Sequence, residues 1–337
     1  MANPNHSNTT QLDLQTQQDL PLVIVLKPPP VLTIFEHEFS KRFQILKAWD
    51  SDLVLDQFLA SQAQSVHAML CYTGGPQISA NVIRLLPSLR LIVTTSAGLD
   101  HIELSECRRR GIAIVTAGDL LSDDVADMAV GLLIDVLRKI SVADRYVRNG
   151  NWATLGDFPL GSQLGGKKIG IVGLGRIGLK VAKRLEAFGC KISYNSRKKK
   201  DSVSYPYFPN VSELAANCDA FIISCGLNEQ SRHMIDRNVL LRLGKEGVIV
   251  NIGRGAIINE KELVECLVKG DIGGAGLDVF ENEPNVPNEL SELDNVVLSP
   301  HRAVYTPESL KDLCQLIIGA LEAFFSNKPL LSLLVDK

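Results

Sequence analysis

Midway along the chain, an apolar strand pattern over Lys168–Val172 leads directly into a turn with three glycines, Gly173-Leu174-Gly175-Arg176-Ile177-Gly178. A helical pattern begins within this turn, because Ile177, Val181 and Leu185 recur on one face. The first glycine allows a tight turn, the second lets the backbone approach a pyrophosphate, and the third lets the helix pack closely on the strand. The sequence therefore predicts a Rossmann-type dinucleotide-binding domain, with this turn as a candidate cofactor site. A glycine-rich turn without a ligand is the alternative.

Strand patterns alternate with amphipathic segments through the whole chain, which is typical of parallel sheets covered by helices. A first series of strands is expected over Leu22–Leu26, Gln44–Leu46, Ala68–Tyr72, Leu91–Thr95 and Ile112–Val115. A second series is expected over Lys168–Val172, Lys191–Tyr194, Ala220–Ser224, Val248–Ile252, Gly274–Leu277 and Val296–Leu298. Two such series in 337 residues indicate two domains.

Two apolar helical patterns flank the second series. The first, Leu121–Arg148, runs without a break and is expected to connect the domains, since a helix of this length would span about 40 Å. The second, Leu310–Phe325, has no following strand and is expected to pack back on the first domain. The predicted fold class is therefore α/β, with two doubly wound parallel-sheet domains. They are a discontinuous, flavodoxin-like domain over 20–119 and 303–337, and a Rossmann-type dinucleotide domain over 120–302.

Composition excludes several other classes of protein. With 45% hydrophobic and 22% charged residues the chain is typical of a globular protein, and its net charge of -3 gives no basic surplus for nucleic acid. No stretch is long and apolar enough for a membrane span, and the N-terminus lacks a signal-peptide pattern. Residues 1–19, rich in Asn, Gln and Thr, are predicted to form a disordered tail. The seven scattered cysteines show no metal-ligand spacing, so we expect reduced thiols, no metal and a cytoplasmic location.

The residues after the strand at 191–194 bear on the choice of cofactor. An enzyme selective for NAD carries an Asp or Glu near this point, which binds the ribose 2′-hydroxyl. This chain instead has Asn195 followed by the hydroxyl of Ser196 and the cations of Arg197 and Lys198. A hydroxyl and cations suit a 2′-phosphate, so we expect a preference for NADP(H), with NAD(H) possible. A solvated run of charge is the alternative.

Three side chains that could carry out chemistry follow strands of the second series. Arg254 comes just after a buried apolar strand, Glu283 lies in a short acidic loop, and His301 follows a Ser-Pro dipeptide. Because ligands bind beyond the carboxyl ends of the strands in an open α/β sheet, we expect all three at one cleft. Reduction of a 2-oxo acid needs a cation on the substrate, a proton donor and a partner that orients the donor. Taken singly, each residue also has an ordinary structural explanation, as a salt bridge, a loop carboxylate or a helix cap.

Four segments together resemble, in order and spacing, the D-2-hydroxyacid dehydrogenase family. They are the glycine turn, Asn251-Ile252-Gly253-Arg254-Gly255, Gly276-Leu277-Asp278-Val279-Phe280-Glu281-Asn282-Glu283-Pro284 and Pro300-His301. The resemblance covers nearly the whole chain and, with Asn195 to Lys198, looks closest to the NADPH-preferring glyoxylate/hydroxypyruvate and hydroxyphenylpyruvate reductases of plants. The chain departs from the family pattern at Arg302-Ala303-Val304, where a Gly usually lies two residues after the His.

The resemblance implies the activity and the catalytic roles. NADPH would reduce glyoxylate or hydroxypyruvate to the D-2-hydroxy acid, with hydroxyphenylpyruvate as an alternative substrate. Arg254 would bind the carboxylate and carbonyl of the substrate, His301 would be the acid/base, and Glu283 would be its partner. The family also implies a homodimer formed through the dinucleotide domain, to which the apolar pattern Asp127–Ile140 could contribute. A nucleotide-sensing binding protein is the alternative from another class, because a fold and even a site can be kept for binding.

The resemblance also implies binding roles outside the catalytic set. Asp278 would hold the nicotinamide carboxamide, and Ile252 and Gly253 would line the nicotinamide side. In the first domain, backbone N–H groups of the loop around Ala97-Gly98 would receive the substrate carboxylate, with the loop around Gly74 facing it. Small residues suit such loops, because the backbone must come within hydrogen-bond reach of the ligand.

Overall fold

The computed structural model describes residues 20–330, and the chain folds into two compact units. Of the described residues, the first unit contains 20–120 and 307–330, and the second contains Leu121–Thr306. The second boundary lies beyond the predicted one after Arg302, because Ala303 is buried in the core of the second unit. The tail predicted over 1–19 lies outside the described residues, as does 331–337.

The first unit contains a parallel sheet with the strand order β2-β1-β3-β4-β5, which is the flavodoxin-like order that the sequence predicts. Every residue of β3 and β4 is buried, so both faces of the sheet centre are covered. The strands are β1 (Leu22–Val25), β2 (Gln44–Lys47), β3 (Ala68–Cys71), β4 (Leu91–Thr94) and β5 (Ala113–Val115). The helices are α2 (Pro30–Ile34), α3 (Glu36–Ser40), α4 (Leu55–Gln62), α5 (Ala80–Arg84), α6 (Leu104–Arg110), α15 (Pro307–Phe325) and a 3-10 turn at Ala48–Asp50.

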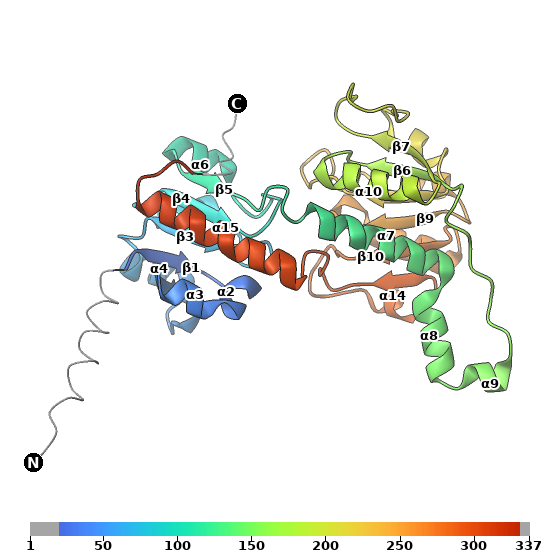
Figure 1. Cartoon of the computed structure of the whole chain (residues 1–337), viewed down its shortest axis with the longest axis horizontal. Helices are drawn as coiled ribbons and strands as arrows, with labels where there is room; N and C mark the ends of the chain where they lie inside the picture. The colour runs from blue at the N-terminus through green and yellow to red at the C-terminus, as the bar shows by residue number, and fades with distance from the viewer. Residues whose placement is uncertain (1–19, 331–337) are drawn as a thin grey trace, which may run out of the picture. The chain divides into compact units, whose positions relative to one another are not determined.

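The long helix α15 completes this first unit. It packs against α2 and β4, as Figure 1 shows for the red helix beside the blue and cyan elements. Leu313, Ile317 and Leu321 on one of its faces are buried. The prediction that the last apolar stretch packs back on the first domain is confirmed.

The second unit contains a parallel sheet with the order β7-β6-β8-β9-β10-β11, of which Figure 1 labels β7, β6, β9 and β10. Its strands are β6 (Lys168–Val172), β7 (Lys191–Asn195), β8 (Ala220–Ile223), β9 (Val248–Asn251), β10 (Gly274–Leu277) and β11 (Val296–Leu298). Its helices are α7 (Ser122–Arg138), α8 (Ile140–Arg148), α9 (Asn151–Leu155), α10 (Arg176–Ala187), α11 (Val211–Ala215), α12 (Arg237–Leu243), α13 (Glu260–Lys269), α14 (Asn288–Glu292) and a 3-10 turn at Gly255–Ile257. Each of the strands predicted for this series is present within one residue of its expected ends.

A further backbone segment extends this sheet beyond β7. Tyr194 and Tyr207 form an isolated parallel bridge, in which Tyr194 N donates to Pro206 O at 3.0 Å and Phe208 N donates to Tyr194 O at 2.8 Å. With this segment counted as the strand that follows β7, the strand order is that of a Rossmann fold. The direction in which successive strands are added reverses between β6 and β8. The sequence analysis missed this segment, because a single bridge leaves no run of alternating apolar residues.

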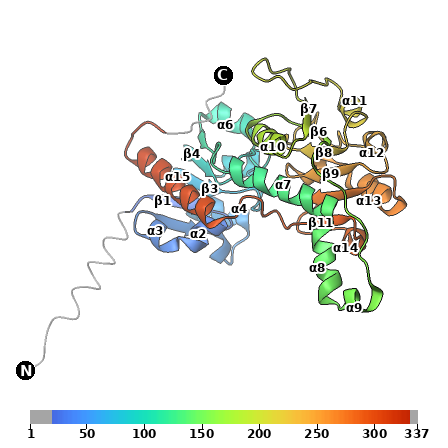
Figure 2. The same cartoon turned by 45° about the vertical axis from the view of Figure 1, so that its right-hand side comes forward.

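The unbroken helix predicted over 121–148 is wrong. Lys139 has a left-handed conformation, with φ of 56°, and separates α7 from α8. The Asp135 carboxylate accepts a hydrogen bond from the backbone N–H of Ser141 at 2.8 Å and another from its hydroxyl, so it stabilises the start of α8. Figure 2 shows α8 leaving the line of α7. Helix α7 packs against α10, β9 and β10 and belongs to the second unit, so it is not a connector.

The apolar side chains of α7 are used within the second unit. Val125, Ala129, Leu132 and Val136 are all buried in its core. Exposed large apolar side chains are found instead on α8, α9 and the segment that follows. Among the described residues, no helix combines the length and apolarity that crossing a bilayer requires.

Candidate active site

The glycine turn joins β6 to α10 at the point where the strand order reverses. Gly173 has φ of 97°, and a Cβ there would lie 2.5 Å from the backbone N of Cys225. A Cβ on Gly178 would overlap the carbonyl oxygen of Gly173. A Cβ on Gly175, in contrast, would meet nothing within 4 Å. Packing therefore requires the first and third glycines, while the open backbone at Gly175 fits the approach of a dinucleotide phosphate.

A cavity of about 1210 Å³ lies beside this turn. It is lined by residues 172–175, 195–200 and 224–228, together with part of 207–211 and 230–234. This is the switch point at which nucleotides bind in doubly wound sheets. Of the predicted cofactor residues, those that line the cavity are Gly173, Leu174, Gly175, Ser196, Arg197 and Lys198. Arg176, Ile177 and Gly178 lie in the first turn of α10 and do not line it.

The loop Ser196–Lys200 makes this cavity electropositive. Arg197, Lys198 and Lys199 are exposed, and none of the described residues that line the cavity is acidic. The hydroxyl of Ser196 donates to the carbonyl oxygen of Lys198 at 2.6 Å, so it stabilises the loop itself. A site with several cations and no acid favours an added phosphate over a ribose hydroxyl.

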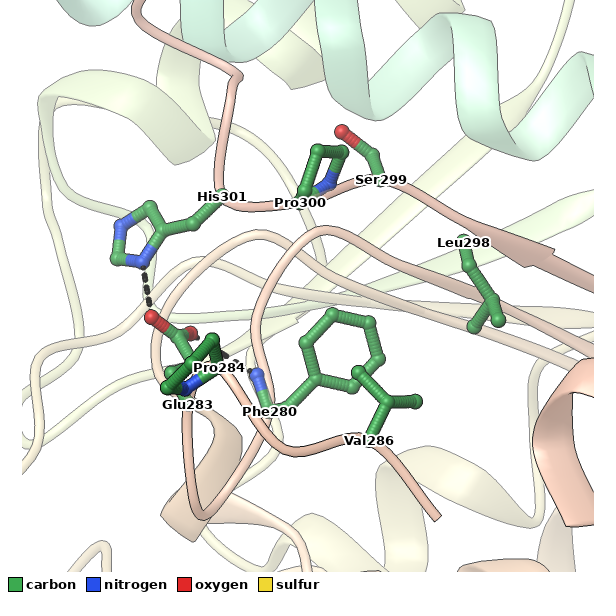
Figure 3. Close-up of a pocket in the computed structure, with 8 residues that line it drawn as sticks. All are labelled: Phe280, Glu283, Pro284, Val286, Leu298, Ser299, Pro300 and His301. Atoms are coloured by element: carbon green, nitrogen blue, oxygen red, sulfur yellow. Dashed lines mark hydrogen bonds and ion pairs between the residues drawn. The ribbon is translucent and has the colours of Figure 1, made fainter. Parts of the chain in front are cut away.

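His301 and Glu283 form a direct pair, as Figure 3 shows. The Nδ1 atom of His301 lies 2.7 Å from Oε2 of Glu283, while Oε1 of Glu283 accepts a hydrogen bond from the backbone N–H of Phe280 at 3.0 Å. Both side chains are about one-third exposed, at 30% for the histidine and 34% for the glutamate. Because the carboxylate takes Nδ1, Nε2 is left as the nitrogen that can exchange a proton with a ligand.

The carboxylate of Glu283 keeps its charge over a wide pH range. Burial opposes ionisation, but the hydrogen bond and charge of His301, the Phe280 N–H and the charge of Arg254 outweigh it. Together they lower the pKa of Glu283 below its ordinary value of 4.5. The partner of His301 is therefore a carboxylate at neutral pH, which is a group that can orient a histidine acid/base.

The loop that carries His301 is held by Asp278. The Asp278 carboxylate is 1% exposed and accepts hydrogen bonds from Ser299 Oγ at 2.5 Å, Arg302 N at 2.8 Å and Ala303 N at 3.1 Å. His301 itself has φ of 55°, a left-handed conformation, and its N–H donates to the Asp278 carbonyl at 2.8 Å. This network fixes an uncommon backbone conformation and thereby aims the imidazole.

Arg254 lies on a turn that is fixed by its own strand. Asn251, which is fully buried, accepts from Gly253 N at 3.0 Å and donates to the Arg254 carbonyl at 2.9 Å. A Cβ on Gly255 would overlap the backbone of Phe280, so the Arg254 turn packs directly on the loop that leads to Glu283. The sequence analysis gave Asn251 no role. The sequence feature that could have identified Asn251 is its position as a polar residue at the end of an otherwise apolar strand.

The first unit holds the remaining predicted residues. Ala97 and Gly98 lie on the loop after β4, and Gly74 lies on the loop after β3. The two loops are joined, because Ser96 Oγ lies 3.1 Å from both the backbone N and the Oγ1 of Thr73. The carbonyl of Gly74 accepts a hydrogen bond from Lys27 Nζ at 3.0 Å.

A smaller cavity of about 220 Å³ lies next to the histidine–glutamate pair. Figure 3 shows the side chains around it, with Phe280, Val286 and Leu298 on the side away from the imidazole ring. Its walls are mainly apolar, and His301 and Glu283 supply polar groups at one edge. Such a cavity can accept an apolar group of a small molecule.

Comparisons with known proteins identify relatives of this chain. The family model described as D-isomer specific 2-hydroxyacid dehydrogenase, NAD binding domain, matches residues 130–303. Glyoxylate/hydroxypyruvate reductase HPR3 of Arabidopsis thaliana is 53% identical over 313 residues, covering 93% of this chain and 97% of the relative. Hydroxyphenylpyruvate reductase of Plectranthus scutellarioides is 47% identical over 308 residues, covering 91% and 97%. The solved NADPH-dependent glyoxylate/hydroxypyruvate reductase of Sinorhizobium meliloti, in complex with NADP and malonate, matches with a TM-score of 0.85 and 32% identity over 94% of this chain and 97% of that chain.

The matched NAD-binding region lies within the second unit, which also contains the glycine turn, Arg254, Glu283 and His301. The similarity to full-length relatives extends through the first unit as well. The motifs, the two parallel-sheet units and these similarities lead to one assignment: the chain belongs to the D-isomer specific 2-hydroxyacid dehydrogenase family.

Proposed function

We propose that this protein is an NADPH-dependent reductase that converts a small 2-oxo acid, glyoxylate or hydroxypyruvate, to the D-2-hydroxy acid. The observation that carries the proposal is the 2.7 Å pair of His301 and Glu283, on a loop packed against the Arg254 turn. The reductase activities of the similar plant proteins support it. The test is loss of NADPH absorbance with glyoxylate, hydroxypyruvate and hydroxyphenylpyruvate, repeated with NADH. Tight nucleotide binding without turnover would favour a nucleotide-sensing binding protein instead.

In the proposed mechanism a bound reduced nicotinamide would supply a hydride to the carbonyl carbon of the 2-oxo acid, and the carbonyl oxygen would take a proton. His301, oriented through Nδ1 by Glu283, protonates the substrate oxygen from Nε2. Arg254 binds the substrate's carboxylate and stabilises the negative charge that develops on the oxygen. After turnover, Glu283 keeps the ring in the tautomer that can be protonated again at Nε2.

Binding roles are proposed for residues around these three. Ile252 and Gly253 would border the nicotinamide, and Asp278 would meet its carboxamide while also holding the His301 loop. The loops at Ala97-Gly98 and Gly74 would contribute to binding the substrate's carboxylate. Their support is the family pattern, together with the small side chains that leave backbone N–H groups accessible.

Hydroxyphenylpyruvate is a second candidate substrate. The 47% identity to a hydroxyphenylpyruvate reductase favours it. A kcat/KM for hydroxyphenylpyruvate above that for glyoxylate would make the aromatic acid the better assignment.

Arg197→Ala is expected to weaken NADPH binding by about 10- to 150-fold and to leave NADH binding within about two-fold. The reason is that a hydrogen bond between charged groups contributes about 1.5–3 kcal/mol, and only NADPH carries the 2′-phosphate. The measurement is the dissociation constant of each cofactor by fluorescence titration. Arg242→Ala, an exposed arginine on α12 outside the cavity, is the matched control. An equal loss for both cofactors would show that Arg197 does not bind the 2′-phosphate.

We also propose a homodimer that forms through α8 and α9. No residue of α8 is buried, and Val147, Trp152, Leu155 and Leu160 are 54%, 65%, 70% and 91% exposed. An exposed apolar cluster of this kind is typical of a protein interface.

The expected mass of the wild-type protein by light scattering is that of a dimer, and Val147→Asp with Leu155→Asp should give the monomer mass. Burying two carboxylates in an apolar interface would oppose association. Val268→Asp on α13, where the side chain is 58% exposed, should leave the dimer intact. A dimer that survives the double substitution would place the interface elsewhere.

A cytoplasmic location is proposed from the thiols. All seven cysteines are free, and six are buried. Proteins with many unpaired cysteines are typical of reducing compartments.

A further inference from the structure

Two tyrosines hold the two ends of the cationic loop Ser196–Lys200. The hydroxyl of Tyr194, whose side chain is fully buried, accepts a hydrogen bond from Lys200 N at 2.8 Å. The hydroxyl of Tyr207 donates to the carbonyl oxygen of Ser196 at 3.1 Å. The two rings pack against each other with their centroids 5.3 Å apart. One packed aromatic pair therefore fixes both the first and the last residue of the loop.

The aromatic pair is itself held rigidly. Tyr194 bonds through its N–H to Pro206 and through its carbonyl to Phe208, which brackets Tyr207 in the third-strand segment. The side chain of Asn195 adds a hydrogen bond to the carbonyl oxygen of Phe208 at 2.8 Å. The Tyr207 side chain also lines the nucleotide cavity. The loop is thus anchored to a part of the sheet that cannot move independently of β7.

The loop needs such an anchor because its charges repel one another. Arg197, Lys198 and Lys199 are consecutive and exposed, and within residues 20–330 none of them forms an ion pair with a carboxylate. A loop of like charges with unrestrained ends would spread into solvent and would have to be ordered when a phosphate binds. Fixing both ends during folding removes much of that ordering cost from binding.

We propose that Tyr194 and Tyr207 are positioning residues that preorganise the cationic loop for a 2′-phosphate and so determine the selectivity for NADPH over NADH. This inference rests on the proposed NADPH preference, which it deepens. The tyrosines act through the loop backbone. Their contribution therefore concerns the 2′-phosphorylated ligand, not the glycine turn or the chemistry at His301.

The test measures binding of two probes by calorimetry: adenosine 2′,5′-bisphosphate, and adenosine 5′-monophosphate, which lacks the 2′-phosphate. Tyr194→Phe and Tyr207→Phe should each raise the dissociation constant of the bisphosphate by about three- to ten-fold, which is the effect of one lost hydrogen bond. The dissociation constant of the monophosphate should stay within about two-fold of the wild-type value. Tyr205→Phe is the matched control. Its hydroxyl donates to Glu186 at 2.6 Å and does not contact the loop, so neither probe should change.

The possible outcomes distinguish failure of the positioning role from failure of the proposed NADPH preference. If the wild-type protein binds both probes equally, the NADPH preference itself is wrong. If the wild type prefers the bisphosphate and both tyrosine variants keep that preference, the positioning role is wrong. Should Tyr194→Phe fail to fold by circular dichroism, Tyr207→Phe carries the test, because Tyr207 is only half-buried.

Discussion

His301→Asn should lower kcat for 2-oxo acid reduction by about 10²–10⁴-fold, the usual contribution of a positioned acid/base. Asparagine removes the imidazole but tolerates the left-handed backbone, where φ is 55°. The loop should therefore keep its hydrogen bonds to Asp278, and the dissociation constant of NADPH should stay within a few-fold of the wild-type value. Steady-state kinetics together with cofactor titration check both parts.

The chain contains a matched control for this substitution. His233 also has a left-handed conformation, with φ of 51°, and its Nε2 lies 2.7 Å from Oε1 of Glu281. It does not line either cavity described above. His233→Asn should therefore leave kcat within a few-fold. If His301→Asn retained full turnover, another group would have to supply the proton, and the mechanism would be wrong.

Arg254→Gln should reduce kcat/KM for glyoxylate by on the order of 10²–10³-fold, as expected for loss of a preorganised group that stabilises charge in the transition state. The turn should survive the loss of the hydrogen bond from Arg254 Nη1 to the Gly253 carbonyl at 2.7 Å, because the Asn251 side chain still holds the backbone at both Gly253 and residue 254. NADPH affinity is expected to stay within a few-fold, so the loss should appear in the kinetics with 2-oxo acid.

Arg254→Lys tests what the guanidinium adds beyond its charge. Lysine keeps the charge but cannot form two parallel hydrogen bonds to a carboxylate, so an intermediate kcat/KM is expected. If the lysine and glutamine variants were equally impaired, the planar fork would matter more than the charge. Wild-type kinetics in both variants would remove Arg254 from the site.

The parts of the fold that sequence predicts well are those with a strong local signal. The buried runs at Ala68–Cys71 and Val248–Asn251 could be placed as strands because a parallel sheet covered on both faces needs continuous apolar segments. The glycine turn was found because strand, turn and helix occur in one order. Arg254, Glu283 and His301 each follow a strand, so topology alone placed them at one edge of the sheet.

The features that escaped prediction depend on conformation or on contacts between distant residues. The break at Lys139 and the left-handed backbone at His301 leave no mark in apolar periodicity. Asp278 follows one strand and accepts hydrogen bonds from Arg302 and Ala303, which follow another strand. The spacing of residues in the sequence does not reveal this contact. The Tyr194–Tyr207 bridge consists of a single residue pair, too short for a strand pattern. The first two depend on backbone conformation and the last two on tertiary contacts, whereas the sequence signals used here are local apolar patterns.

The discontinuous first unit has a consequence for how the chain is made. Its five strands are synthesised first, but α15, which covers part of that sheet, is translated only after the whole second unit. The second unit is continuous in sequence and can complete its core as soon as it leaves the ribosome. Until Leu313, Ile317 and Leu321 arrive, the first sheet lacks the apolar side chains that close its core. Folding is therefore expected to finish in the reverse order of synthesis, with the unit translated first completed last.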